Sequence, residues 1–234
     1  MTAGRTQCTT CAARTDSVLC RLSDDEATLF EATSKTVLYG KGQMIFQQGA
    51  LPRVLYCVSR GKVKLVQEGS DGREQIIHLA KNGDLLGYRA ILGNDRYSCS
   101  AVAIEDTEVC CIPRQVFLDT LRKNPELSFQ LMLLFAAELK DAERKITTIA
   151  QRPVRERLAQ SLLLLKDSYG FGDDGSTINV SVTREEIANL TGTTRETAIR
   201  VLFELNDEKV IGLHAKKIAI LDEPRLATIA NLSE

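Results

Sequence analysis

The sequence predicts an α+β protein in which a β-rich domain precedes a long helix and a winged helix-turn-helix. Three observations predict this class. Short alternating or β-branched runs separated by glycines lie between Val37 and Pro113. Apolar residues at helical spacing then recur from Pro125 to Gln151. Closer to the C-terminus, two helix-start signals follow each other at short distance.

The composition is that of an ordinary globular chain. The 234 residues are 44% hydrophobic and 26% charged, with a formal net charge of −1. No apolar run has the length of a membrane-spanning helix, and the N-terminus lacks the apolar segment of a secretory signal, so we expect a cytoplasmic protein without membrane attachment. Because basic and acidic residues balance overall, any affinity for DNA must come from local placement of charge.

Changes of pattern along the chain predict four segments. They are an N-terminal arm with cysteines over residues 1–22, a β-roll sensor domain over 23–123, a long helix over 124–151 and a winged helix-turn-helix domain over 152–234. Ser23 and Glu26 form a capping box that predicts a helix over residues 23–33. The strands of an antiparallel barrel or sandwich are expected at MIFQQ, VLYCVS, KVKLVQE, EQIIHLA, SAVAIE and EVCCI.

The long helix carries an apolar stripe, in which apolar residues recur every few positions on one side. A stripe of this kind suits a seam between two helices. The residues that we expect in such a seam are Leu127, Leu131, Leu134, Ala142, Ile146 and Ile149. The alternative is a helix that packs only on its own domain.

The stretch VTREEIANLTGTTRETAIRVLFEL, residues 182–205, predicts two short helices joined by a tight turn. Thr183 and Glu186 form one capping box, and Thr193 and Glu196 form a second. Gly192 lies between the helices, where a tight turn needs a residue without Cβ. This is the pattern of a helix-turn-helix, whose second helix enters the major groove of DNA. The alternative is a solvated amphipathic helix with surface ion pairs.

The regions beside this stretch also have predicted structures. A helix is expected over Val154–Ser168 and a short strand over Ile178–Val182, before the first of the two helices. After the second, two alternating runs around His214-Ala215-Lys216 predict a β-hairpin wing. We expect Lys216 and Lys217, at its tip, to contact phosphates.

The motif T-R-E-E-I-A-x-x-x-G-x-x-R-E-T-x-x-R, which runs without a gap from Thr183 to Arg200, resembles the helix-turn-helix of the Crp/Fnr family of bacterial transcription regulators. The resemblance implies a homodimeric DNA-binding regulator, not an enzyme. It further implies a sensor domain of the cyclic-nucleotide-binding type, RNA polymerase as a partner, and the long helix as the dimer seam.

The resemblance places Arg195, Glu196 and Arg200 at the family's base-reading positions and implies palindromic double-stranded DNA with TGTGA-like half-sites. The chemistry agrees, because an arginine fork can bind O6 and N7 of guanine and a glutamate can accept from N4 of cytosine. Pairing at i,i+4 is expected to orient the side chains of Glu196 and Arg200. The other expected DNA contacts are Thr183, Arg184, Thr194, Lys216 and Lys217.

The cyclic-AMP-binding members of the family hold the ribose with a glutamate and the phosphate with an arginine. In this sequence Tyr88 and Tyr97 stand in those two places. Arg89 or Arg96 could compensate for the phosphate anchor, but neither restores the acceptor. We therefore expect no cyclic AMP binding.

The cysteines suggest a different sensor. The family's oxygen sensors carry an N-terminal cysteine triad and a fourth cysteine in a V-C-x-I-P context, which together hold a [4Fe-4S] cluster. Here Cys8, Cys11 and Cys20 match the triad, and the run Val109-Cys110-Cys111-Ile112-Pro113 places Cys110 as the fourth ligand. Zinc, a thiol redox switch and no cofactor remain alternatives for the arm, and Cys99 or Cys111 remains an alternative to Cys110. Cys57 and Cys111 are expected in the core.

Two further hypotheses remain open. The first is the same regulator controlled by a small ligand in the β-roll. The second is a thiol redox enzyme that uses C-x2-C. The sequence disfavours the enzyme, because the motif lies on a polar arm and does not open a helix after a strand.

Overall fold

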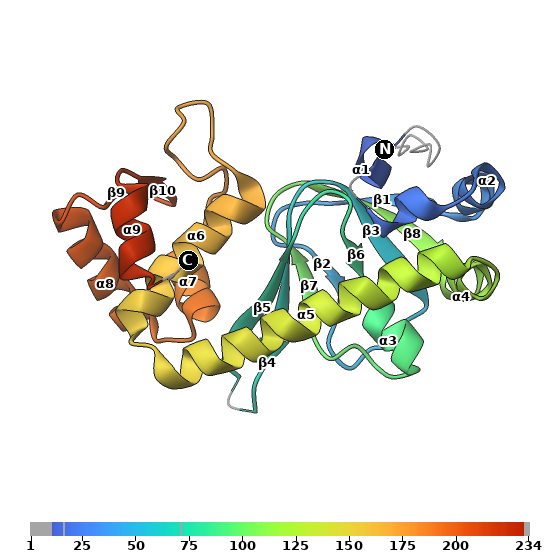
Figure 1. The fold of residues 1–234 in the computed structure, drawn as a ribbon, viewed down its shortest axis with the longest axis horizontal. Coiled ribbons are helices and arrows are strands. Elements are labelled where there is room, and N and C mark those ends of the chain that lie inside the picture. Colours follow the sequence, from blue (N-terminus) through green and yellow to red (C-terminus); the bar gives the residue numbers. More distant parts are fainter. Residues whose placement is uncertain (1–10, 16, 71, 232–234) are drawn as a thin grey trace. The chain divides into compact units, whose positions relative to one another are not determined.

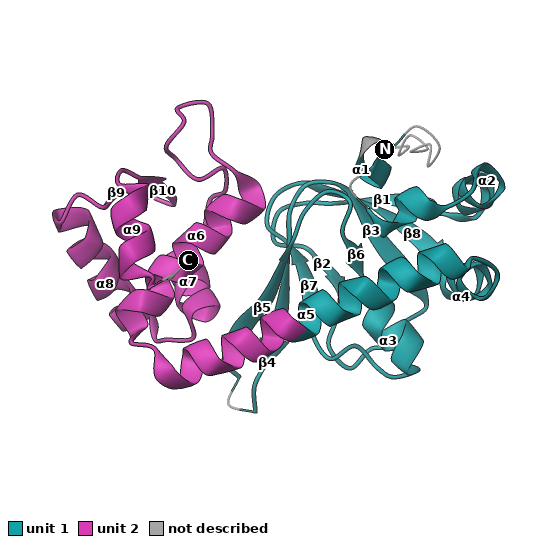
Figure 2. Ribbon diagram, in the orientation of Figure 1, with its two compact units in different colours: residues 1–139 teal, residues 140–234 magenta. Residues whose placement is uncertain are grey.

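The computed structural model describes residues 11–15, 17–70 and 72–231. Cys8, one of the expected cluster ligands, therefore lies outside the described residues. The chain divides into two compact units, residues 1–139 and 140–234 (Figure 2). The division falls inside the long helix α5 (Pro125–Gln151), whose bounds are those expected from its apolar stripe.

In its described residues, the first unit contains four further α-helices, one 3-10 helix and eight strands. The α-helices and strands are labelled in Figure 1. Its helices are α1 (Ala12–Thr15), η1 (Val18–Arg21), α2 (Asp24–Thr33), α3 (Tyr88–Gly93) and α4 (Arg114–Lys123). Its strands are β1 (Lys35–Tyr39), β2 (Met44–Phe46), β3 (Val54–Arg60), β4 (Val63–Glu68), β5 (Glu74–Ala80), β6 (Leu85–Leu86), β7 (Ser100–Ala103) and β8 (Thr107–Pro113).

The strands form two four-stranded antiparallel sheets, with the orders β1-β8-β3-β6 and β2-β7-β4-β5. The predicted β-roll is thus confirmed. One apolar core lies between the sheets and includes Phe46, Val58 and Val109. A second core covers the outer face of the first sheet, where strand residues such as Leu55 and Ile112 meet the helices and the arm.

The predicted seam on α5 needs correction at its N-terminal end. Leu127 is 1% exposed and Leu131 is 4% exposed, both in the second core, and Leu134 packs against that core. These three leucines hold α5 on its own domain and leave little or no surface for a second chain. Ala142, Ile146 and Ile149 lie further along the helix and are exposed, as a seam requires.

The second unit contains the rest of α5, four more helices and a hairpin. Its further elements are α6 (Val154–Tyr169), α7 (Arg184–Thr191), α8 (Arg195–Asp207), β9 (Ile211–His214), β10 (Lys217–Ile220) and α9 (Glu223–Ile229). The helix-turn-helix and its wing are thus confirmed. Among its described residues, the chain has no helix that is both long and apolar enough to cross a membrane.

The strand expected over Ile178–Val182 is wrong. Ile178 makes an isolated bridge with Phe171, and the backbone N–H of Val180 donates to the carbonyl of Ile178 at 2.7 Å. That local bond turns the chain, so the apolar alternation marks buried anchor points of an irregular segment.

Candidate nucleic-acid interface

The first helix of the motif, α7, starts at the predicted capping box. Thr183 Oγ1 accepts from the backbone N–H of Glu186 at 3.1 Å, and Glu186 Oε2 accepts from the N–H of Thr183 at 2.8 Å. Gly192 ends the helix in the left-handed region, with φ of 73°, and donates to the carbonyl of Ala188. Glycine adopts this conformation without the steric cost that a Cβ would add.

The second helix, α8, starts one residue later than predicted. Its cap is Thr194, whose Oγ1 accepts from the N–H of Thr197 at 3.3 Å. Thr193 instead belongs to the turn, where its N–H donates to the carbonyl of Ala188 at 3.1 Å. The second predicted capping box is therefore wrong, and the carboxylate of Glu196 takes no part in the cap.

The recognition residues expected on α8 lie on a different face from its buried residues. Ala198, Val201, Leu202 and Leu205 are buried. The three expected base-reading residues, Arg195, Glu196 and Arg200, are all exposed in the first two turns. Within the described part of the chain, the side chains of Arg195 and Glu196 make no hydrogen bond or ion pair. Both groups are thus open to an external partner.

Arg200 has a different ion-pair partner from the one expected. Its Nη1 lies 2.6 Å from Oε1 of Glu204, one turn further along α8, and not against Glu196. Glu204 is also approached by Arg155 of α6, whose Nη1 is 3.5 Å from Oε2. A carboxylate held from a second helix is a better-defined partner than Glu196, whose exposed side chain makes no ion pair within the described residues.

The remaining expected DNA contacts lie at helix starts and at the wing. Arg184 is the first residue of α7, and burial lowers the pKa of its guanidinium. Thr183 and Thr194 cap the two helices. Lys216 and Lys217 are exposed beside the β9–β10 turn, which Ala215 makes with φ of 53°.

Two arginines attach the end of α5 to this domain. Arg157 of α6 donates from Nη1 to the carbonyl of Ile149 at 2.9 Å and from Nη2 to the carbonyl of Gly192 at 3.1 Å. Arg152 donates to the carbonyl of Ala230 at 2.8 Å. The last turn of α5 and the turn of the helix-turn-helix therefore share a donor, the guanidinium of Arg157.

Aromatic rings stack inside the β-roll at the place where the family's phosphate anchor would stand. Phe46 stacks on Tyr97 with ring centroids 4.1 Å apart and on Tyr56 at 5.4 Å. Tyr97, which stands where cyclic-AMP-binding relatives have an arginine, is buried, and this burial raises its pKa to about 12. A neutral buried phenol offers no charge to a cyclic phosphate.

The two arginines that could replace the phosphate anchor are engaged elsewhere. Arg89 of α3 binds Glu138 of α5, with Nη2 2.7 Å from Oε2. Arg96 donates from Nη1 to the carbonyl of Gly49 at 2.8 Å. Tyr88, at the family's glutamate position, packs into the second core, on the helix side of the sheet.

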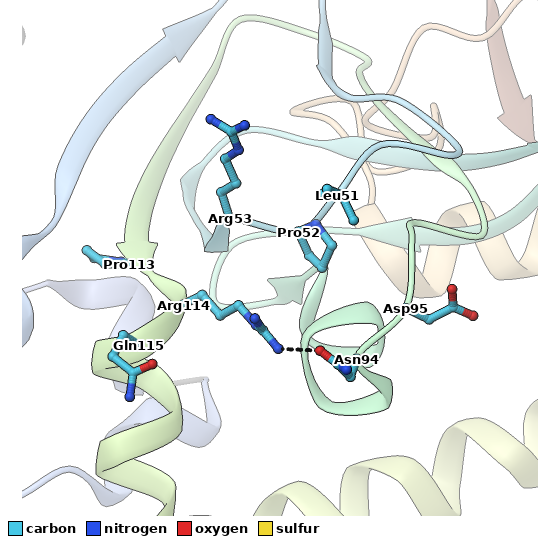
Figure 3. Close-up of a pocket in the computed structure, with 8 residues that line it drawn as sticks. All are labelled: Leu51, Pro52, Arg53, Asn94, Asp95, Pro113, Arg114 and Gln115. Carbon is cyan, nitrogen blue, oxygen red and sulfur yellow. Dashed lines mark hydrogen bonds between the residues drawn. The ribbon is translucent and has the colours of Figure 1, made fainter.

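A surface pocket of about 460 Å³ lies beside the start of α4 (Figure 3). Arg53 and Arg114 are among its lining residues, but their guanidinium groups do not converge. Arg114 donates to Oδ1 of Asn94 at 2.8 Å, which occupies one of its donors. The pocket is an open depression on the β-roll surface and does not resemble an enclosed ligand cavity.

The structure separates the cysteines by face. Cys110 of β8 is paired in register with Cys57 of β3, and both are buried in the second core, beside the arm. Cys111 follows on the opposite face, where burial raises the pKa of its thiol to about 11. Cys99 is buried between the sheets. The core position expected for Cys57 is confirmed, while Cys111 is only half-buried.

The two described thiols of the arm, Cys11 and Cys20, lie beside the sensor but in different environments. Helix α1 packs against β3, and Cys11 before it is half-buried, whereas Cys20 is exposed. Cys11, Cys20 and Cys110 have the thiol chemistry that an iron–sulfur cluster needs. In the described ranges, however, no three potential metal ligands lie close enough together to bind one metal.

Comparison with known proteins agrees with both domains. The family model described as cyclic nucleotide-binding domain matches residues 36–124, and the one described as Crp-like helix-turn-helix domain matches residues 156–229. The chain is 33% identical to the cyclic AMP receptor protein of Thermus thermophilus, over 89% of this chain and 94% of that protein. It is 32% identical to the fumarate and nitrate reduction regulatory protein of Vibrio cholerae, over 83% and 78%.

Solved structures give the same fold. FixK2 from Bradyrhizobium japonicum superposes with a TM-score of 0.75 at 24% identity, covering 86% of this chain and all of that one. The catabolite activator protein of Thermus thermophilus is 32% identical over 92% of this chain and 98% of that one, with a TM-score of 0.51. These relatives are transcription regulators, not enzymes, and this chain, with its β-roll, long helix and Crp-like helix-turn-helix, is a DNA-binding transcription regulator of the Crp/Fnr family.

Proposed function

We propose that the protein acts in the cytoplasm as a homodimer that reads a palindromic operator with the N-terminal turns of α8. The observation that carries this proposal is the exposure of Arg195, Glu196 and Arg200 at the start of a capped recognition helix. Arginine and glutamate at these positions suit a G·C-containing half-site of the TGTGA type. Recruitment of RNA polymerase follows from family membership and belongs to the same proposal.

Selection from random DNA is expected to return TGTGA and its complement TCACA around a short spacer. Each mismatched base pair should cost about 1–3 kcal/mol of binding free energy. Glu196→Ala should relax the preference at one base pair more than it lowers general affinity, because its carboxylate has no structural partner to lose. Asp207→Ala, at the C-terminal end of the same helix, is the matched control and should leave the preference unchanged. An asymmetric or unrelated selected site would refute the assignment.

The proposed dimer uses an exposed face of α5. Of the seam residues expected from the sequence, this face includes Ile146, and it adds Met132 and Leu139. Met132, Leu139 and Ile146 are 59%, 61% and 69% exposed and lie seven residues apart. Phe129 and Ala136 are also exposed and provide the first two alternate positions of the same heptad pattern, which Glu143 continues. Apolar residues repeated in this way pack as knobs into the holes of a partner helix. A second copy of α5 is the occupant that such a pattern fits.

We further propose that a [4Fe-4S] cluster on the arm gates DNA binding in response to oxygen. Support comes from the thiols on the arm, from the packing of α1 on β3, and from Cys110 on the sheet face that the arm and helices cover. A related protein that carries the name fumarate and nitrate reduction regulatory protein is consistent with it. When bound, such a cluster would supply an oxygen-labile link between the arm and the sensor. Cys11, Cys20 and Cys110 would have to come closer together to share it, because they form no metal-binding group in the described structure.

Anaerobically purified protein is expected to be brown and to contain about four iron atoms per chain. Cys110→Ser should abolish the colour, because Cys110 is the sheet thiol that stands in the family's fourth-ligand context, Val109-Cys110-Cys111-Ile112-Pro113. Cys111→Ser is the matched control and should keep the colour, because its side chain lies on the other face of β8. Cys57→Ser is also expected to keep it. Absorption spectra together with iron and sulfide analysis make the measurement.

Oxygen should bleach the wild-type protein and weaken its binding to operator DNA. Zinc in place of iron, in anaerobic preparations with intact cysteines, would indicate a structural site. Colourless protein that binds DNA equally with and without oxygen would exclude cluster gating and favour control by a small ligand.

A further inference from the structure

Arg200 is the end of a chain of alternating charges that crosses three helices. Its Nη1 lies 2.6 Å from Oε1 of Glu204, and the other oxygen of Glu204 lies 3.5 Å from Nη1 of Arg155. Nη2 of Arg155 is 2.7 Å from Oε1 of Glu208, whose Oε2 is 2.9 Å from Nη2 of Arg225. The recognition helix α8 is thereby linked to α6 and α9 through side-chain charges.

The two oxygens of the Glu204 carboxylate have different arginine partners, and this fixes the position of the carboxylate. One oxygen faces Arg200 and the other faces Arg155, so the carboxylate is fixed from two helices. An isolated pair at i,i+4 on an exposed helix contributes little, but a network restricts the geometry of each member more firmly. Glu204 is half-buried, with its side chain 39% exposed, whereas the Arg200 side chain is 64% exposed. The held partner is therefore the glutamate, and the guanidinium projects from it.

Glu204 also leaves Arg200 able to bind a base. A guanidinium carries five N–H donors, and the contact with Glu204 engages the Nη1 end. The remaining donors can still address O6 and N7 of a guanine. Because arginine has many rotamers in solution, a fixed carboxylate one turn away reduces the ordering that base contact would otherwise require.

We propose that Glu204 is a positioning residue for Arg200 and sets the specificity at the base pair that Arg200 reads, with Arg155 supporting it from α6. This inference rests on the base-reading role of Arg200 in the proposed function. It adds a residue that lies beyond the helix-turn-helix motif shared with the family, which runs from Thr183 to Arg200. A purely structural role for Glu204 would change stability, or affinity for all sequences alike, and would leave the order of preference among bases unchanged.

The test is Glu204→Gln in the full-length protein, with competition binding against the selected operator and each single-base variant of its half-site. We expect discrimination at one base pair to fall about fivefold or more, because the arginine fork is no longer oriented. Preferences at the other positions should change less than about twofold. Affinity for non-specific DNA should rise slightly, since one negative charge near the phosphates is lost.

Asp207→Asn is the matched control, because it removes the same charge from an exposed position of the same helix. It should shift affinity for all sequences uniformly. Arg155→Gln should reproduce the loss at the same base pair in weaker form, because Glu204 then keeps only one partner. This second variant also tests the inference if Glu204→Gln should fold poorly in thermal melts.

Arg200→Ala identifies the base pair that Arg200 reads. It also separates two claims: that Arg200 reads this base pair, and that Glu204 positions Arg200. Loss of preference at one base pair in Arg200→Ala, with Glu204→Gln behaving like Asp207→Asn, would overturn the positioning role alone. Unchanged preferences in Arg200→Ala would instead overturn the base-reading assignment on which it rests. Loss at the same base pair in Arg200→Ala and Glu204→Gln, with Asp207→Asn uniform, is the expected result.

Discussion

Ile146→Glu is expected to dissociate the proposed dimer and to abolish operator binding with it. Ile146 is 69% exposed in one chain and continues the heptad positions of Met132 and Leu139. Across a two-fold axis the substitution would place two glutamates in an apolar seam, where each must be desolvated against a like charge. An uncompensated buried charge costs several kcal/mol, so the dissociation constant should rise by roughly a hundredfold or more. Sedimentation and operator titration measure the two effects.

Ala137→Glu provides the control for this substitution. Ala137 is exposed on the same helix but lies outside the positions that repeat with Met132, Leu139 and Ile146. It should leave the dimer intact. If Ile146→Glu remained fully dimeric at the concentrations where the wild type is, the seam would have to lie on another face.

Among glycine-to-alanine substitutions in the sensor domain, Gly61→Ala is expected to lower the free energy of unfolding most. Gly61, between β3 and β4, has φ of 107°, and a Cβ there would lie 2.5 Å from Oγ1 and 2.8 Å from Cα of Thr107. Thr107 cannot yield easily, because it is 1% exposed and its hydroxyl donates to the carbonyl of Glu105 at 2.8 Å. Backbone strain and overpacking together should remove about 2–5 kcal/mol from the free energy of unfolding.

Gly93→Ala is the comparison. Gly93 is the last residue of α3, its φ is not positive, and an added Cβ would meet no atom within 4 Å. Its stability should equal or slightly exceed that of the wild type, because alanine lowers the entropy of the unfolded chain. Denaturant unfolding of both variants gives the measurement. Equal stability of Gly61→Ala and the wild type would show that the β3–β4 turn can move away from Thr107 of β8 without cost.

Features that depend on a few neighbouring residues were predictable from the sequence. Ser23 with Glu26, and Thr183 with Glu186, start α2 and α7 as expected, because a capping box is closed by residues three positions apart. The bounds of α5 also follow from local signals, a proline at its start and an apolar period along it. The exposure of Arg195, Glu196 and Arg200 follows from the amphipathic period of α8.

Where the local pattern allows two arrangements, the sequence did not predict which of them the folded protein adopts. The stripe on α5 placed leucines and isoleucines on one predicted seam, and only the folded domain shows that Leu127 is buried within its own chain while Ile146 is exposed. Arg200 has a glutamate four residues away in each direction. Its choice of Glu204 becomes understandable only when Arg155 approaches from α6.

The sequence by itself determined the order of the domains, the starts of α2 and α7, and the outward face of the recognition helix. These depend on hydrogen bonds and apolar periods that close within a turn or two of the chain. Only the tertiary structure decided which side of α5 remains exposed, which thiols share a face, and which carboxylate pairs with Arg200. Cys57 meets Cys110, and Arg155 meets Glu204, across long stretches of sequence. Where local patterns favour two arrangements equally, packing and ion pairs between distant segments decide which one forms.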